Sequence, residues 1–182
     1  MKNVVLTEAK RIDLIAPFWK PVDWTSFDVV KKVRSQIKPN KVGHAGTLDP
    51  FAEGVLVLCI GKKTRESQQI MSFEKEYIGT IRFGVETDTL DSTGKAVKEW
   101  PIPNLTNAMV SWALESFIGN IEQIPPMYSA LKKNGQPLYK LARKGITVER
   151  KPRTVHVSKI KILDLCNETL TLKINCGKGT YI

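Results

Sequence analysis

The chain has 182 residues, of which 42% are hydrophobic and 25% charged, and its formal net charge is +10. This composition is typical of a globular protein and excludes a disordered tail, a collagen-like chain and a coiled coil. The charge favours a polyanionic partner, of which nucleic acid is the commonest, although a merely basic surface would give the same number.

Hydrophobic patterning predicts a strand, a helix, a second strand and a second helix in the first part of the chain. Ile12 to Ala16 is a short apolar run that predicts a strand. Phe27 to Ile37 carries valines at helical spacing and follows the cap residues Thr25-Ser26. The continuous apolar run Val55 to Ile60 predicts a buried strand, and Lys63 to Met71 is expected to be helical.

Strand patterns dominate the rest of the chain. Tyr77 to Phe83 alternates as a strand does, and Val155 to Leu165 with Leu170 to Cys176 resembles a hairpin. Between them Thr106 is expected to cap a helix. The apolar face of that helix would consist of Met109, Val110, Ala113, Leu114 and Phe117. Strands outnumber helices and occur in pairs, which predicts an α+β fold with a mostly antiparallel sheet.

The cysteines and the amino-terminal residues predict the compartment. Cys59, Cys166 and Cys176 are odd in number and lie in apolar or alternating runs, which favours buried reduced thiols in the cytoplasm. Met1 to Glu8 lacks the long apolar stretch of a signal peptide, and no run is long enough for a membrane helix. With only two histidines besides, the sequence offers no metal-ligand spacing.

The charge is concentrated in one segment. Glu122 to Arg153 holds eight Lys and Arg against two acids, which is +6 of the +10, and it is interrupted by Pro and Gly. A mobile basic arm of this kind suits a phosphate backbone, and Tyr128 and Tyr139 could stack on unpaired bases. The alternative is a solvated loop anchored by Leu138 and Leu141. The cations expected to contact RNA are Lys132, Lys133, Arg143, Lys144, Arg150 and Arg153.

A second segment carries the groups suited to chemistry. Gly43 to Pro50 joins the first helix to the buried strand and holds one imidazole, His44, and one carboxylate, Asp49. Pro50 restricts the backbone of Asp49, so the carboxylate is held in a stiff turn where its surroundings can tune it as a nucleophile or proton carrier. The alternative is that Asp49 caps a turn and His44 fills a gap.

Five ordered stretches of this sequence resemble the TruB family of tRNA pseudouridine synthases. The most specific is the segment around Asp49, which resembles the family's signature. The stretches are Lys20-Pro21 with Thr25-Ser26, Gly43 to Leu56, Lys75-Glu76-Tyr77, Gln123 to Lys132, and Gly177 to Ile182.

The resemblance implies isomerisation of uridine to pseudouridine at position 55 in the T loop of tRNA, by base flipping, without a cofactor or a metal. Asp49 would be the nucleophile, attacking either C1′ of the ribose or C6 of the uracil. His44 would hold the rearranged RNA loop, Tyr77 would stack on the flipped base and take part in proton transfer, and Tyr181 would contact the substrate. Read alone, both tyrosines fit ordinary positions in a sheet.

The resemblance also implies a pseudouridine synthase catalytic fold, a mixed, mostly antiparallel sheet flanked by helices, formed as one domain over residues 1–182 with an inserted thumb at about 122–153. In the family an arginine follows the motif that ends here at Ile182, so the chain is expected to lack that arginine, the remaining catalytic elements and any carboxy-terminal RNA-binding extension. We expect a cytoplasmic monomer that binds the T arm of tRNA. Two alternatives stay open, a tRNA-folding module without required catalysis and a guide-RNA-dependent relative.

Overall fold

The structure, a computed structural model, describes residues 12–37 and 41–182, which divide into two compact units, Met1–Ser72 (unit 1) and Phe73–Ile182 (unit 2). The stretch Met1 to Glu8, for which no signal peptide is predicted, lies outside the described residues. That residues 1–182 form one catalytic domain stays a prediction.

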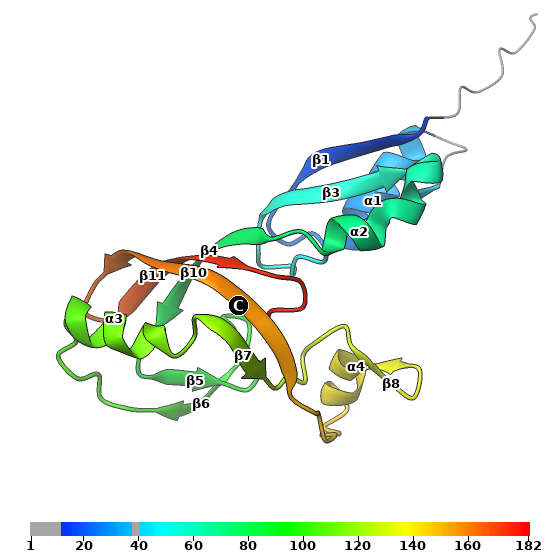
Figure 1. Ribbon diagram of the computed structural model, residues 1–182. Coiled ribbons are helices and arrows are strands. Elements are labelled where there is room, and N and C mark those ends of the chain that lie inside the picture. Colours follow the sequence, from blue (N-terminus) through cyan, green and yellow to red (C-terminus); the bar gives the residue numbers. More distant parts are fainter. Residues whose placement is uncertain (1–11, 38–40) are drawn as a thin grey trace, which may run out of the picture. The chain divides into compact units, whose positions relative to one another are not determined.

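Unit 1 is built on a three-stranded antiparallel sheet with the order β1-β3-β2 (Figure 1). Its elements are β1 (Leu14–Lys20), α1 (Ser26–Gln36), β2 (Val42–His44), β3 (Gly54–Ile60), the 3-10 helix η1 (Gly61–Glu66) and α2 (Ser67–Met71). The predicted helix over Lys63 to Met71 is therefore two pieces, a 3-10 turn followed by a short α-helix.

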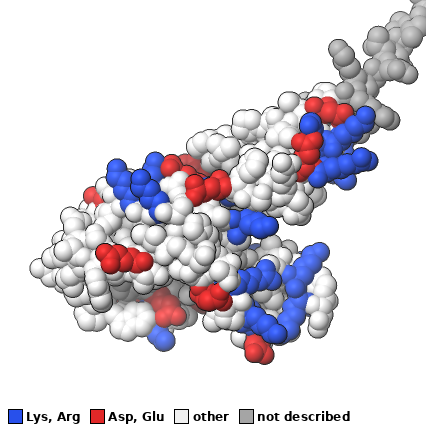
Figure 2. Space-filling model, in the orientation of Figure 1, with Lys and Arg blue, Asp and Glu red and all other residues white. Residues whose placement is uncertain are grey.

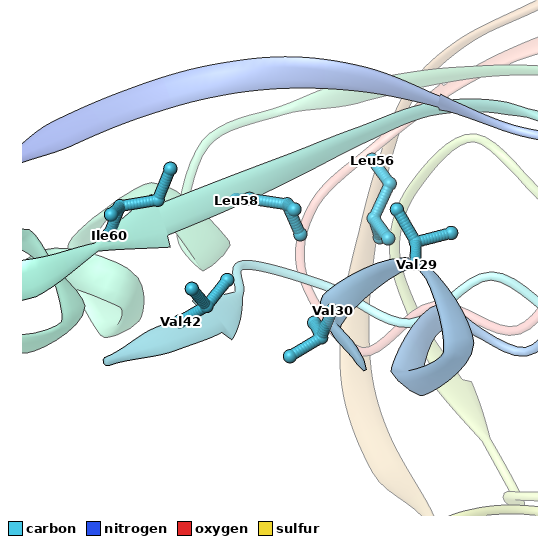
Figure 3. Packing of buried hydrophobic residues seen from close by; sticks show 6 residues of the cluster. All are labelled: Val29, Val30, Val42, Leu56, Leu58 and Ile60. Carbon is cyan, nitrogen blue, oxygen red and sulfur yellow. The ribbon is translucent and has the colours of Figure 1, made fainter. Parts of the chain in front are cut away.

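The core of unit 1 lies between α1 and the sheet (Figure 3). Val29 and Val30 come from α1 and are buried against strand residues, including Leu56 and Leu58 of β3. Burying an aliphatic side chain of this size stabilises a fold by about 1.5–3 kcal/mol, so the predicted valine face is what holds α1 on the sheet. The helix begins at the predicted cap, since the Thr25 side chain accepts a hydrogen bond from the backbone of Asp28.

Unit 2 is built on a four-stranded antiparallel sheet with the order β4-β11-β10-β7 (Figure 1). Two smaller strand pairs, β5-β6 and β8-β9, accompany it. The elements are β4 (Lys75–Arg82), β5 (Val85–Thr87), β6 (Ala96–Glu99), α3 (Asn107–Glu115), β7 (Gly119–Gln123), β8 (Lys132–Lys133), β9 (Gln136–Pro137), α4 (Leu138–Ala142), β10 (Arg153–Leu165) and β11 (Thr169–Cys176). The α+β prediction with antiparallel sheets is confirmed, and so is the predicted hairpin, now β10 and β11.

The helix predicted after Thr106 is α3, and Thr106 caps it by accepting from the backbone of Met109. Its buried face is narrower than predicted. Val110 is buried against Leu170 and Leu172 of β11, whereas Met109 is 50% exposed and Phe117 lies beyond the end of the helix and is 54% exposed.

The prediction of three buried thiols is wrong at one position. Cys59 and Cys176 are buried, and burial raises the pKa of both thiols. Cys166 is exposed because it lies in the turn between β10 and β11, where its backbone N–H donates to the carbonyl of Thr169. Its thiol donates to Asp164.

Over residues 12–37 and 41–182, no helix combines the length and apolar character needed to cross a membrane. Nor does that part of the chain bring together three or more His, Cys, Asp or Glu side chains that could hold a metal ion.

Candidate active site

Asp49 lies in the exposed turn that leads from β2 into β3. Its carbonyl accepts a hydrogen bond from the N–H of Ala52 at 3.1 Å, which closes the turn around Pro50. Gly46, three residues earlier, has φ +137°, a backbone conformation that favours glycine and allows the loop to bend away from β2. The loop therefore presents the carboxylate at the surface of unit 1 on a closed turn.

The backbone just before Asp49 is held by Ser26, which is buried at the start of α1. The N–H of Leu48 donates to the Ser26 hydroxyl at 2.9 Å, and the hydroxyl donates to the carbonyl of Leu48 at 3.1 Å. Both polar groups of the residue before the carboxylate are thus satisfied by one side chain from another element.

The backbone just after Asp49 is held by Lys20, whose side chain is fully buried at the end of β1. Its ammonium donates to the carbonyls of Pro21 (2.9 Å), Trp24 (2.7 Å) and Pro50 (3.3 Å). A buried ammonium is stable only when its donors are satisfied, and these carbonyls do so.

The charge of Lys20 also belongs to the electrostatics of this loop. Burial lowers the pKa of the Lys20 ammonium, and the carboxylates of Asp23, Asp49 and Glu53 oppose that effect by attraction. The N–H of Asp23 donates to the Pro50 carbonyl at 2.8 Å, a second restraint on the same group. The Lys-Pro motif does not predict this role of Lys20, because its partner Pro50 is thirty residues away and sequence spacing gives no signal for it.

His44 is the last residue of β2 and is half-buried. Its Nδ1 is hydrogen-bonded to the carbonyl of Gly46, which can only accept, so Nδ1 carries the proton. In the neutral ring Nε2 is then the acceptor. His44 and Asp49 lie on the same loop of unit 1, and the role of His44 toward RNA stays a prediction.

The other predicted site residues belong to unit 2. Tyr77 is half-buried on the edge strand β4, opposite Ile174 of β11. Residues two apart on a strand share a face, so Lys75, Tyr77 and Gly79 form one row. Burial lowers the pKa of the Lys75 ammonium, which donates to the carbonyl of Phe73 at 2.7 Å.

Tyr181 follows β11 in the last predicted motif and is half-buried. Its N–H donates to the Gln123 side chain at 2.9 Å, and its carbonyl accepts from the same side chain at 2.8 Å. No local pattern predicts this pair, since Gln123 lies 58 residues away at the start of the thumb motif.

The predicted thumb, residues 122–153, contains β8, β9 and α4. Figure 2 shows Lys and Arg side chains gathered over the part that carries α4 and β8, at the lower right of the view. Arg150 is half-buried, whereas the other predicted cations are exposed: Lys132, Lys133, Arg143, Lys144 and Arg153. Of the ion pairs found over residues 12–37 and 41–182, none involves these six cations.

Comparison with known proteins gives a consistent family. The profile of the TruB family pseudouridylate synthase, N-terminal domain, matches residues 34–182. The chain is 46% identical over 159 residues to tRNA pseudouridine synthase B of Francisella philomiragia, covering 87% of this chain and 53% of that protein. It is 43% identical over 173 residues to tRNA pseudouridine synthase B of Opitutus terrae, covering 95% and 72% respectively.

A solved structure agrees in fold. The crystal structure of a Cbf5-Nop10-Gar1 complex matches with a TM-score of 0.66 and 26% identity, over 92% of this chain and 40% of that one. The chain spans about half the length of several curated relatives that it matches, 53% in the Francisella protein. With the profile matched over residues 34–182 and the Opitutus relative covered over 72% of its length, the chain belongs to the TruB family of pseudouridylate synthases.

Proposed function

We propose that this protein is a tRNA pseudouridine synthase, an isomerase that converts uridine to pseudouridine at position 55 in the T loop. The observation that carries the proposal is the Asp49 turn, an exposed carboxylate between two backbone positions fixed by buried side chains. Family membership and 46% identity to a tRNA pseudouridine synthase B support the substrate.

The reaction exchanges one glycosidic bond for another within the same nucleotide. The C1′–N1 bond breaks, the uracil turns, and a C1′–C5 bond forms while N1 gains a proton and C5 loses one. If Asp49 attacks C1′, it serves as the nucleophile of a retaining glycosidase does, with the detached base in place of water as the second nucleophile. If it adds to C6 instead, the same carboxylate is the nucleophile, and this route too is proposed to need no cofactor or metal.

A fixed backbone favours either route. A nucleophile held near its attack position avoids the entropic cost of finding it, which contributes several kcal/mol to catalysis in well-oriented systems. Ser26 and Lys20 fix Leu48 and Pro50, the residues on either side of the carboxylate. The rigidity of the turn is therefore part of the proposed chemistry.

The target base must leave its stack to reach the carboxylate, and unstacked loop bases are commonly held by aromatic rings. Tyr77 is proposed to stack on the flipped uracil and to take part in the transfer of the C5 proton. Tyr181 is proposed to contact the same base, and His44 to hold the rearranged RNA loop. The exposed thumb cations would contact the phosphate backbone of the T arm.

Two other functions were open from the sequence, a tRNA-folding module and a guide-RNA-dependent relative. The tRNA pseudouridine synthase B relatives are 43% and 46% identical, against 26% for the Cbf5 structure, which favours a protein that selects tRNA directly. A folding activity can coexist with the isomerase.

The test is tritium release from a T-arm RNA that carries tritium at C5 of the uracil at position 55. Full-length protein is expected to release the tritium, because C5 loses its hydrogen when it forms the bond to C1′ of the ribose. An RNA tritiated only at another loop uridine is the control and should release none. Absence of release from position 55, or equal release from both RNAs, would overturn the proposed activity or its site.

A further inference from the structure

The segment that ends in Tyr181 leaves the sheet through a turn. After β11, the N–H of Gly177 donates to the carbonyl of His156 on β10 at 2.8 Å. The Thr180 hydroxyl then donates to the Gly177 carbonyl at 3.1 Å, and Gly179 has φ +83°, which favours glycine. From this turn the chain no longer follows the β11 ladder.

Tyr181 reaches β7 although a strand separates β7 from β11. In the order β4-β11-β10-β7, β10 occupies the ladder between them, so β7 and β11 do not pair. Gln123 is the last residue of β7, and its side chain makes the two backbone hydrogen bonds to Tyr181 that a neighbouring strand would otherwise make. Its amide accepts from the Tyr181 N–H at 2.9 Å and donates to the Tyr181 carbonyl at 2.8 Å. A primary amide offers both a donor and an acceptor, which matches the two backbone groups.

We infer that Gln123 is a positioning residue for the reaction, which sets Tyr181 against the substrate base and ties it to the root of the thumb. This inference rests on the proposed function. Gln123 lies at the start of the predicted thumb, residues 122–153, so one side chain joins the RNA-binding segment to a tyrosine proposed to contact the base. The same restraint reaches β4, because a Cγ atom of Ile182 lies 3.7 Å from where a Cβ on Gly79 would be.

The sharpest variant is Gln123→Glu in the full-length protein. When ionised, the new carboxylate accepts from the Tyr181 N–H but repels the Tyr181 carbonyl; when protonated, it donates and restores both bonds. We expect kcat of this variant, relative to wild type, to fall about tenfold as the pH rises from about 3 to about 6, the range over which an ordinary glutamate ionises.

The charged groups around position 123 decide where that transition falls. Arg153 lies directly opposite on β10 and favours the ionised form, which moves the transition to lower pH. Glu122 points to the other face of β7 and binds the Thr154 hydroxyl at 2.5 Å.

Gln123→Leu removes both bonds at every pH. We expect kcat about tenfold below wild type with RNA affinity within about twofold, since the thumb cations remain. Asn120→Asp is the matched control, because it makes the same amide-to-carboxylate change on β7, where Asn120 is hydrogen-bonded to His156 and not to Tyr181. Its pH profile should follow that of wild type.

The outcomes separate this inference from the proposed function. A pH-dependent loss in Gln123→Glu that Asn120→Asp does not share, measured at a temperature and pH where both variants are folded, supports the positioning role. Wild-type kcat in both Gln123 variants overturns the inference and leaves the proposed function intact. A wild-type protein without tritium release overturns both.

Discussion

The Asp49 turn and the thumb use their charged and polar groups in opposite ways. Around the turn, the Lys20 ammonium is buried and donates to three backbone carbonyls. The Ser26 hydroxyl is also buried, and it is hydrogen-bonded to both the N–H and the carbonyl of Leu48. In the thumb, all but one of the predicted cations are exposed. A buried charge fixes a backbone, whereas an exposed charge remains available to a polyanion, and we interpret the two regions as a chemical part and a binding part.

The Asp49 turn and the thumb also differ in the structure that supports them. Unit 1 ties its turn to α1 through Ser26 and to β1 through Lys20, whereas the regular structure within the thumb is two two-residue strands and the five-residue α4. The thumb keeps two buried polar atoms without a hydrogen-bond partner, Ser129 Oγ and Arg150 Nε. Such atoms cost roughly 1–3 kcal/mol each, which makes the thumb the region expected to rearrange when a partner binds.

The largest expected effect separates chemistry from binding. Asp49→Asn keeps the shape of the side chain and removes its nucleophilic charge, so tritium release should fall more than about 10³-fold. RNA affinity, measured by filter binding, should stay within about threefold of wild type, because the thumb is unchanged. Release within tenfold of wild type would remove Asp49 from the chemistry.

The second effect concerns the thumb. The variant replaces four exposed cations with alanine: Lys132, Lys133, Arg143 and Lys144. RNA affinity at about 0.1 M salt should fall about tenfold to a hundredfold, and the slope of log affinity against log salt should flatten by about 3.

A variant of equal charge serves as the control for the thumb. It removes four lysines elsewhere in unit 2: Lys95, Lys98, Lys159 and Lys161. Its salt slope should stay close to that of wild type. An equal flattening in both variants would mean that net charge, and not the thumb, governs binding.

The third effect tests whether the buried charge holds the turn. Lys20→Met keeps most of the side-chain volume and removes the ammonium from the carbonyls of Pro21, Trp24 and Pro50, of which Pro50 keeps the N–H of Asp23, so the free energy of unfolding should fall by about 2 kcal/mol in urea titration. Lys31→Met is the matched control, because Lys31 is exposed and pairs with Asp28 at 3.5 Å on the surface. Equal losses in the two variants would contradict the role of Lys20.

The smallest effect concerns the start of α1, which positions Ser26. The hydrogen bonds from Thr25 hold the pKa of Asp28 below its ordinary value. A carboxyl group with a lowered folded-state pKa stabilises the protein above its unfolded pKa, and this contribution is lost as the pH falls through the folded pKa. Asp28→Asn should therefore be less stable than wild type at pH 7, and the gap should close below about pH 4. A difference in urea midpoint between wild type and Asp28→Asn that stays the same from pH 7 to below about pH 4 would contradict this prediction.

Features with local causes could be predicted from the sequence. Thr25 and Thr106 mark the beginnings of α1 and α3, because a cap and an apolar periodicity lie within a few residues of each other. The hairpin of β10 and β11 was predictable for the same reason. The loop around Asp49 was predictable as a stiff turn from Gly46 and Pro50.

Features set by distant partners could not be predicted. The strand predicted over Ile12 to Ala16 is β1, Leu14–Lys20, because pairing with β3 extends to Lys20 opposite Gly54. Pro17 is tolerated there because β1 is an edge strand. The bonds from Lys20 to Pro50 and from Gln123 to Tyr181 span 30 and 58 residues, so no local pattern encodes them.

The most direct test of the division between turn and thumb is single-turnover tritium release by the thumb variant at saturating RNA. If the thumb only binds, the rate constant at saturation should lie within about threefold of wild type although much more RNA is needed to reach it. A rate constant about a hundredfold lower at saturation would place the thumb in the chemical step and contradict the account.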